Sequence, residues 1–377
     1  MSKWKTVRLG EICSLNMGQS PKSDTYNNNG VGIPFFQGNA DFGAINPNIN
    51  HWCSEPVKIA NVDDILISVR APVGALNIAN FKCCIGRGLA SITVDKSIAE
   101  RNFIWYMLKS KIDELQSKSN GSTFKAINKT TLYDVTFPLP PLEIQKQIAS
   151  SLDKVTRIID LCNAIIEKMD FLVKAKFVEM FGGINNSNLY PYHSVDTFTN
   201  VTSGGTPERK NNDYWDNGLI PWIKTTELHN NVICEAEESI TEKGLNESSA
   251  KLVPKGTILI AMYGQGKTRG MTALLDIESS TNQACACILP CDKLNTIYLW
   301  QYFVLSYDKL RDLAKGGNQP NLNVNIIKKF PVLVPPITLQ EQFANFVEKT
   351  DNSKSAVKQV LEKAEILKKS LMQEYFK

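Results

Sequence analysis

PPLEIQKQ at residues 140–147 and PPITLQEQ at residues 335–342 are the stretches that decide the fold of this chain. The two copies lie 195 residues apart (335 minus 140), and the same offset pairs Trp105 with Trp300. Proline is tolerated in the first turn of a helix and disfavoured further in, so each Pro-Pro pair marks a helix start. The two stretches therefore predict two copies of one unit, each ending in a helix.

The repeat extends over the whole chain, and its offset shrinks through small insertions toward the start of each half. Three further pairs of segments match: GQSP at 18–21 with GGTP at 204–207, IPF at 33–35 with IPW at 220–222, and ILI at 65–67 with ILI at 258–260. Chance could produce one match but not an ordered series, so the chain is an internal duplication. Short apolar runs broken by Gly, Pro and Asn predict strands and turns in each half. One helix per half is expected, at about 101–119 and 295–314.

A long helical pattern follows each Pro-Pro pair, at about Leu142–Phe181 and Ile337–Phe376. In the first, apolar residues from Ile148 to Val173 recur at alternating steps of four and three, which is a heptad seam. A helix of about 40 residues is about 60 Å long and cannot bury such a stripe alone. We expect the two helices to pack against each other. The alternative is that each helix packs on its own globular domain.

The predicted fold class is α+β, with two mixed α/β domains, each followed by a long helix. The two helices are expected to form an antiparallel coiled coil with pseudo-two-fold symmetry. The predicted segments are domain 1 (1–139), long helix 1 (140–183), domain 2 (184–334) and long helix 2 (335–377).

Composition narrows the classes of function. The 377 residues include 42 Lys+Arg, 38 Asp+Glu, nine Cys and three His, with a formal charge of +4. There is no apolar run of about 18 residues and no secretory leader pattern, so we expect no membrane association. An odd number of scattered cysteines is typical of a reducing compartment, which predicts a cytoplasmic protein. Three isolated histidines indicate no metal site.

Two motifs resemble catalytic or metal-binding sequences. AMYGQGKT at 261–268 is close to a phosphate-binding loop, but its first glycine is Ala261 and the residues that follow predict a strand, not the required helix. Cys285 and Cys287 alternate along a predicted strand without a fourth ligand nearby, which favours small buried cysteines over zinc. We find no Gly-rich S-adenosylmethionine loop and no nuclease cluster.

The duplicated arrangement resembles the DNA-specificity subunit of type I restriction–modification systems. The resemblance covers essentially the whole chain and rests on these segments: GGTP at 204–207, YW at 214–215, IPWIKTTEL at 220–228, GTILI at 256–260, GNQPNLN at 317–323 and both Pro-Pro-x-x-x-Gln-x-Gln helix starts. The first half departs from the pattern, because GSTFKAIN at 121–128 lacks the Gln-Pro pair and FFQ at 35–37 replaces WIK.

The resemblance implies that each domain reads half of an asymmetric bipartite site in double-stranded DNA and that the long helices fix the unread gap. It also implies two modification subunits that supply S-adenosylmethionine and adenine methylation, and two restriction subunits that supply ATP/Mg-driven translocation and cleavage. This chain would bind no cofactor and perform no catalysis. The alternatives are a subunit of a related nuclease–methylase system, a modification-only complex, and a scaffold with carbohydrate-binding or adhesion modules.

The predicted DNA contacts follow from loop position and side-chain chemistry, since Arg, Lys, Gln, Thr and Tyr contact phosphates and base edges. In the first half they are Gln19, Ser20, Lys22, Arg70, Lys82 and Arg87. In the second half they are Thr206, Lys224, Thr225, Tyr263, Gln265, Lys267 and Arg269. Residues 143–181 carry no net charge and 337–377 carry +1, which leaves only +3 for the globular parts. So small a charge predicts weak DNA binding by the chain alone.

Overall fold

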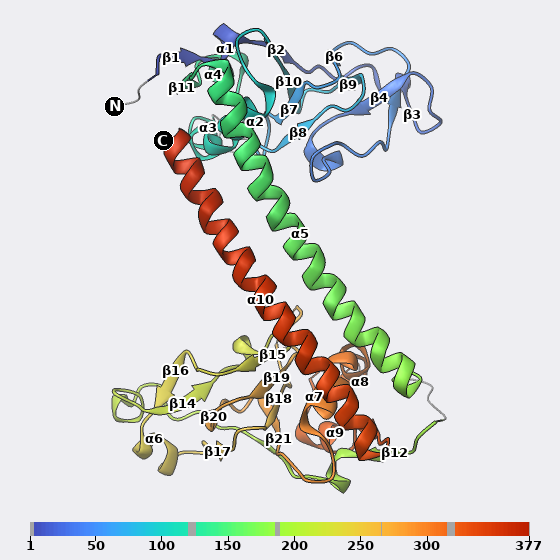
Figure 1. Ribbon diagram of the computed structural model, residues 1–377, viewed down its shortest axis with the longest axis vertical. Coiled ribbons are helices and arrows are strands. Elements are labelled where there is room, and N and C mark those ends of the chain that lie inside the picture. The colour runs from blue at the N-terminus through green and yellow to red at the C-terminus, as the bar shows by residue number, and fades with distance from the viewer. Residues whose placement is uncertain (1–3, 120–125, 185–188, 265, 315–320, 377) are drawn as a thin grey trace. The chain divides into compact units, whose positions relative to one another are not determined.

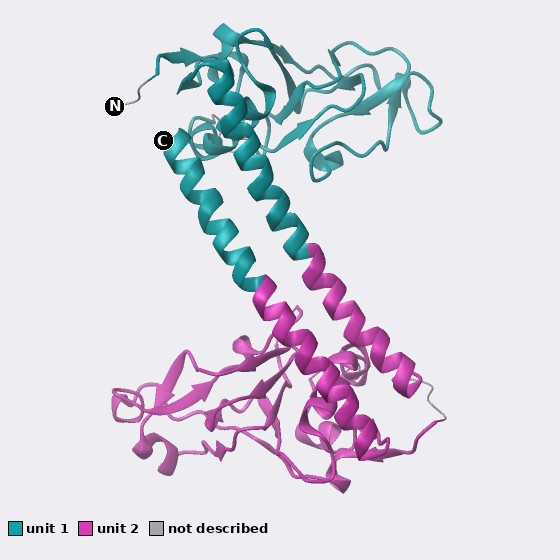
Figure 2. Ribbon diagram, in the orientation of Figure 1, with its two compact units in different colours: residues 1–163, 358–377 teal, residues 164–357 magenta. Residues whose placement is uncertain are grey.

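The structure is a computed structural model that describes residues 4–119, 126–184, 189–264, 266–314 and 321–376. The chain forms two compact units (Figure 2): unit 1 comprises residues 1–163 and 358–377, and unit 2 comprises residues 164–357. Each unit therefore contains one mixed α/β domain and a segment of both long helices. The division into four segments at 139, 183 and 334 stays a prediction.

The domain of unit 1 carries three sheets, ordered β1-β11, β2-β10-β7-β8 and β3-β5-β4-β9-β6. Its elements, most of them labelled in Figure 1, are β1 (Thr6–Arg8), α1 (Leu9–Ile12), β2 (Cys13–Met17), β3 (Tyr26–Asn27), β4 (Ile33–Phe36), β5 (Trp52–Cys53), β6 (Ile59–Ala60), β7 (Ile65–Ser68), β8 (Leu76–Ile78), β9 (Cys83–Ile85), β10 (Leu89–Val94), α2 (Arg101–Ser110), α3 (Ile112–Ser117), α4 (Lys129–Tyr133) and β11 (Thr136–Pro138).

The domain of unit 2 also carries three sheets, ordered β12-β22, β13-β21-β18-β19-β15 and β16-β14-β20-β17. Its elements are β12 (Tyr192–Ser194), β13 (Val201–Ser203), β14 (Ile220–Ile223), β15 (Asn231–Ile233), β16 (Glu238–Ile240), α6 (Glu242–Asn246), β17 (Leu252–Val253), β18 (Ile258–Ala261), β19 (Thr272–Leu275), β20 (Ser279–Thr281), β21 (Cys285–Ile288), α7 (Thr296–Leu305), α8 (Tyr307–Leu313), α9 (Val324–Lys328) and β22 (Pro331–Leu333).

The central strand pairs repeat in register between the two units. In unit 1, β10 pairs antiparallel with β7, with Ile92 opposite Ile65. In unit 2, β21 pairs antiparallel with β18, with Ile288 opposite Ile258. All four side chains are buried. The predicted duplication is thus present in the hydrogen-bond register as well as in the sequence.

The single helix predicted in each half is wrong, because each is two short helices. The chain breaks at Lys111 between α2 and α3 and at Ser306 between α7 and α8. At both breaks the amide N–H bonds a carbonyl three residues back, Lys111 to Leu108 and Ser306 to Phe303. This tighter turn ends an α-helix and lets the following helix take a new direction.

The two long helices, α5 (Leu142–Phe181) and α10 (Ile337–Phe376), begin and end as the sequence predicts. The Gln145 side chain is fully buried at the start of α5: its Oε1 accepts from Glu100 N (2.9 Å), and its Nε2 donates to Pro140 O (2.8 Å) and Ile98 O (3.1 Å). The first glutamine of the motif therefore fastens the helix start to the loop before α2. Gly182 ends α5 in the left-handed region (φ 76°).

The same anchor occurs at the start of α10. Gln340 is buried, its Oε1 accepts from Asn295 N (2.9 Å), and its Nε2 donates to Pro335 O (2.8 Å). Asn295 precedes α7 as Glu100 precedes α2. The second glutamine of each motif, Gln147 or Gln342, is exposed. In each repeat, therefore, the first glutamine of the motif supplies the buried side-chain amide that anchors the start of the long helix.

Within each unit the core takes the start of one long helix and the end of the other. In unit 1 the ring of Phe376, which ends α10, lies 5.2 Å from Phe103 of α2. In unit 2 the ring of Phe181, which ends α5, lies 5.2 Å from Tyr298 of α7. Each helix end therefore makes the same aromatic contact in the unit where it finishes, which rules out the alternative of helices packed only on their own domains.

The long helices run antiparallel within unit 2. Phe177 of α5 lies 5.5 Å from Phe343 at the start of α10, and Asp170, earlier in α5, pairs with Lys354, later in α10. Of the predicted heptad seam, five residues are buried: Ile148, Leu152, Val155, Cys162 and Val173. Three residues that widen the stripe, Ile158, Ile165 and Leu172, are exposed.

The two look-alike motifs lie in strands and turns. β18 ends at Ala261 and the next element is the strand β19, which begins at Thr272, so the near-miss phosphate loop joins two strands. Cys285 and Cys287 lie in β21 and are fully buried among the side chains of the sheet. Burial raises the pKa of the Cys287 thiol to about 11. In the described part of the chain, no helix is both long and apolar enough to cross a membrane.

Candidate functional site

The candidate site of unit 1 is a cavity of about 430 Å³ beside the β3-β5-β4-β9-β6 sheet. Its lining residues come from five segments of the chain: Ser20, Tyr26, Phe35, Gln37, His51 and Arg87. The rings of Tyr26 and Phe35 stack with their centroids 4.6 Å apart. The parallel pairing of β4 with β9 places Gln37 and Arg87 together, because each follows the last residues of its strand.

Polar contacts fix the positions of three of these side chains. Gln37 Nε2 donates to Ser20 Oγ (2.8 Å), and the Arg87 backbone N–H reaches the same oxygen at 3.5 Å. His51 Nδ1 lies 2.7 Å from Asn28 Oδ1. Ser20 and Arg87, both predicted contact residues, therefore belong to one site.

Unit 2 builds the same backbone frame with different side chains. In each unit, a backbone N–H donates to the carbonyl of the last residue of the strand that pairs in parallel with β4 or β14. Gln19 N donates to Ile85 O (3.0 Å) in unit 1, and Gly205 N donates to Thr281 O (2.8 Å) in unit 2. The register makes these pairs equivalent: Ser20 and Thr206, Phe35 and Trp222, Gln37 and Lys224, His51 and Glu238, Arg87 and Gln283.

A glycine precedes this frame in both repeats because the backbone passes too close for a side chain. A Cβ at Gly18 would lie 2.2 Å from Gly86 O, and a Cβ at Gly204 would lie 2.1 Å from Thr281 O. This close approach explains why GQSP and GGTP share their first residue. The frame is therefore set by backbone geometry, and the side chains on it are free to differ.

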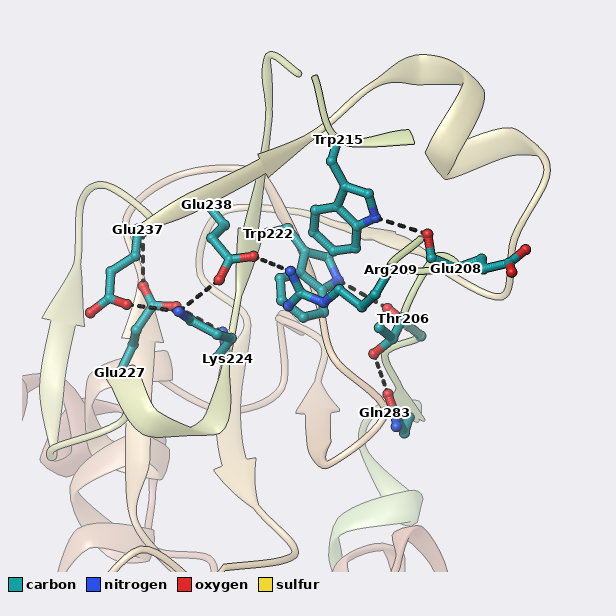
Figure 3. A network of polar contacts seen from close by, with 11 residues as sticks. Thr206, Glu208, Arg209, Trp215, Trp222, Lys224, Glu227, Glu237, Glu238 and Gln283 are labelled. Atoms are coloured by element: carbon teal, nitrogen blue, oxygen red, sulfur yellow. Dashed lines mark hydrogen bonds and ion pairs between the residues drawn. The ribbon is translucent and has the colours of Figure 1, made fainter. Parts of the chain in front are cut away.

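In unit 2 the site is filled by Arg209 (Figure 3). Its guanidinium carbon lies 3.9 Å from the Trp215 ring centroid and 4.5 Å from that of Trp222, and the group pairs with Glu238. Both indoles are held by backbone carbonyls; Trp222 Nε1, for example, donates to Gly205 O (3.0 Å). Cation–π contact and a charge-assisted hydrogen bond together hold Arg209 in place.

Lys224 is the second cation of this network. Its Nζ lies 2.9 Å from a Glu237 oxygen and 2.8 Å from a Glu238 oxygen. Hydrogen bonds to Glu237 and then Glu238 raise the pKa of Lys224, and the contact with Lys224, followed by that with Arg209, lowers the pKa of Glu238. Two cations therefore face two carboxylates, so this site adds little net positive charge.

The loop after β18 forms a second group of predicted residues, separate from the Arg209 network. Side chains of α8 hold its backbone: Tyr307 Oη donates to Lys267 O (2.7 Å), and Arg311 Nη1 donates to Arg269 O (3.1 Å). Tyr263 and the Lys267 side chain are exposed. Gln265 lies outside the described residues. Tyr263 and Lys267 therefore present their side chains to solvent next to a backbone that α8 holds, whereas Arg269 is partly buried.

The remaining predicted residues are exposed or partly exposed. Gln19, Lys22, Arg70 and Lys82 are exposed, and Thr225 is partly exposed at the turn after β14. Thr206 donates a hydrogen bond to Gln283, which brings it into the same site as Lys224. None of these residues is tested as a DNA contact, so all stay predictions.

Sequence reasoning missed most of the side chains that complete the two sites. The missed residues are Tyr26, Phe35, Gln37 and His51 in unit 1 and Arg209, Trp215, Trp222, Glu237, Glu238 and Gln283 in unit 2. The repeat could have found part of them, because aligning the halves through the strand register pairs Arg87 with Gln283. Arg209 has no such indication, since its partner Glu238 lies 29 residues away in sequence.

Two copies of one sheet frame, each carrying its own set of polar and aromatic side chains, define a duplicated recognition protein. The chain belongs to the family of the type I restriction modification DNA specificity domain, whose profile matches residues 1–170 and 194–368. It is thus a specificity subunit of the type I restriction–modification class. This finding confirms the family that the sequence resembles.

Individual relatives agree with the family. The chain is 46% identical over 160 residues to the MjaX type I specificity subunit of Methanocaldococcus jannaschii, covering 42% of this chain but only 38% of that protein. It is 23% identical over 376 residues to the MjaIX specificity subunit of the same organism, covering 92% and 86%. The S subunit of M. genitalium has the same fold, with a TM-score of 0.67, 15% identity, and coverage of 100% of this chain and 96% of that one.

Proposed function

We propose that this chain reads an asymmetric bipartite site in double-stranded DNA, one half with each unit, for a multisubunit modification and restriction complex. One observation carries the proposal: the two units share a backbone frame but differ at each side chain on it, as Gln37 against Lys224 and Arg87 against Gln283 illustrate. One partner type contacted by both frames and two different half-sites read by the side chains would account for this pattern.

The chemistry of the complex belongs, in this proposal, to partner subunits. Two modification subunits would bring S-adenosylmethionine and methylate adenine, and two restriction subunits would bring ATP and Mg²⁺. The chain supplies recognition and binds no cofactor. The small net charge of the unit 2 site supports this division of roles between the chain and its partners. Glu237 and Glu238 neutralise Arg209 and Lys224, which leaves little attraction for phosphate.

The exposed face of α5 supports recruitment of a modification subunit. Within unit 2, Ile165 and Leu172 lie seven residues apart on one face of α5 and are 41% and 50% exposed. Apolar side chains gathered on one helix face mark a protein-binding surface more often than scattered ones. We expect Leu172→Lys to reduce co-purification with the modification subunit, while Val31→Lys, which changes another exposed apolar residue, leaves it intact. Equal loss with both variants would contradict this assignment.

Selection from a random duplex library tests the recognition role directly. The chain assembled with its modification subunit should enrich two short blocks separated by a gap of fixed length, and methylated adenines should lie in the same motif. The chain alone should enrich DNA weakly. Methylation or cleavage of DNA by the isolated chain would refute the non-catalytic role and favour a nuclease–methylase. Absence of a shared motif would refute sequence recognition.

The long helices are proposed to set the gap, through antiparallel packing with pseudo-two-fold symmetry. Removing seven residues from each of α5 and α10 preserves the heptad phase and shortens the pair by about 10 Å. At 3.4 Å per base pair this corresponds to about three base pairs. We therefore expect the tolerated gap to shorten by about three base pairs while both half-sites stay the same. An unchanged gap would refute the spacer role.

A further inference from the structure

The cavity of unit 1 is open at the place that Arg209 fills in unit 2. In unit 2 the guanidinium lies over Trp222 and pairs with Glu238, the residues equivalent to Phe35 and His51. At the offsets of 186 and 187 residues that relate the two flanking matched segments, the counterparts of Arg209 are Ser23 and Lys22, and neither side chain lines the cavity. The frame of unit 1 therefore retains the aromatic platform but lacks the flat group that covers it.

The equivalent residues of the two sites also differ in charge, and unit 1 lacks the carboxylate that pairs with Arg209 in unit 2. Glu238 of unit 2 is replaced by His51 in unit 1, and Gln283 is replaced by Arg87. The lining residues of the unit 1 cavity include no carboxylate and one cation. A guanidinium or ammonium group would meet repulsion there without a counter-charge, so an arginine from elsewhere is a poor occupant.

The side chains of the cavity suit a flat, uncharged ring with hydrogen-bonding edges. The stacked pair of Tyr26 and Phe35 offers an aromatic platform. The Gln37 amide, held by Ser20 at 2.8 Å, supplies both a donor and an acceptor, and the His51 ring adds another polar edge. A nucleobase combines these properties, and Arg87 at the rim would face its phosphate.

We propose that the unit 1 cavity binds a single nucleobase turned out of the DNA duplex. The proposal rests on the function proposed above and adds a recognition mode that only unit 1 has. The cost of unstacking and unpairing the base is offset by its stacking on Tyr26 and its hydrogen bonds to Gln37. In unit 2 Arg209 occupies the corresponding place, so its half-site would be read without base extrusion.

The test uses the chain assembled with its modification subunit and the duplex motif found by library selection. At each position of the half-site read by unit 1, the partner base on the opposite strand is replaced by an abasic site. This change removes the cost of unpairing but keeps the base that would enter the cavity. Positions of methylated adenines are left out of the scan. We expect the affinity to rise about tenfold at one position of the unit 1 half-site and at no position of the unit 2 half-site.

Two variants connect that gain to the cavity. Tyr26→Ala removes the platform, and His51→Glu installs the carboxylate found in unit 2 at an exposed position that does not threaten folding. Both should abolish the tenfold gain. His229→Glu makes the same change at an exposed histidine of unit 2 and should leave the gain intact. Thermal unfolding of each variant checks that the fold is retained.

The outcomes separate this proposal from the function on which it rests. If the complex bound its motif but no abasic partner improved binding, the nucleobase pocket would be refuted and sequence recognition would stand. A gain that persisted in both cavity variants would refute it as well. If the variants instead weakened assembly with the modification subunit in the absence of DNA, the cavity would be a protein-docking site. If no motif were bound at all, both proposals would fail.

Discussion

The glutamine of the Pro-Pro motif gives a sharp test of how this fold is held together. Gln145→Ala removes three hydrogen bonds from a side chain that is fully buried, and it leaves Glu100 N–H, Pro140 O and Ile98 O without that partner. A buried hydrogen bond contributes about 1 kcal/mol net, so the loss is about 3 kcal/mol. For a unit of this size, that corresponds to a fall in Tm of about 6 to 12 °C.

The chain contains its own control for this experiment. Gln147 belongs to the same motif and the same helix turn but is exposed, so Gln147→Ala should change stability by less than about 0.5 kcal/mol. Gln340→Ala removes the two equivalent bonds in unit 2 and should cost about 2 kcal/mol.

Urea unfolding followed by tryptophan fluorescence, with thermal scans beside it, measures all three variants. The order of destabilisation should be Gln145→Ala, Gln340→Ala, then Gln147→Ala. If Gln147→Ala cost as much as Gln145→Ala, or if Gln145→Ala cost less than about 1 kcal/mol, the motif would not act by anchoring the helix start. The reasoning from buried amides would then be refuted.

Three further predictions concern packing, thiol chemistry and the filled site of unit 2. Phe376→Ala should destabilise unit 1 by about 3 to 5 kcal/mol in urea unfolding, because it removes a buried ring from the core. Phe171→Ala, which changes an exposed ring, should alter the stability little. Similar losses of stability in the two variants would contradict the packing. At pH 8 a thiol reagent should label exposed Cys234 in the native protein. Buried Cys287, whose pKa is raised to about 11, should stay a protonated and unreactive thiol until the protein unfolds. Labelling of Cys287 before unfolding, detected by peptide mass, would contradict its burial. Arg209→Ala should change the tryptophan emission and alter selection at the unit 2 half-site only, so a change at the other half-site would contradict the division of labour.

The repeat made the long helices predictable from sequence. Pro-Pro at each start, a heptad seam through the first helix and Gly182 at its end are local features, and they agree with the bounds of α5 and α10. The short helices were less predictable. Helical periodicity continues through Lys111 and Ser306, but the chain tightens at both residues, so each expected helix became two.

The candidate sites were only partly predictable. Ser20, Arg87, Thr206 and Lys224 could be chosen because loops with polar side chains are the usual place for DNA contacts. Their partners could not, since Tyr26 meets Phe35 and Arg209 meets Glu238 only after strands distant in sequence have paired.

The sequence by itself determined that the protein is a duplication of one domain and one long helix. Helix starts and heptad seams depend on residues that are close together in sequence, and the repeat can be found by comparing such short segments. Only the tertiary structure decided how the two copies differ at their sites: one holds an open aromatic cavity, and the other is closed by Arg209. The physical reason is the distance along the chain between the groups that meet. Arg209 can cover its site, and Tyr26 can stack on Phe35, only because strand pairing brings residues that are distant in sequence within a few ångströms of each other.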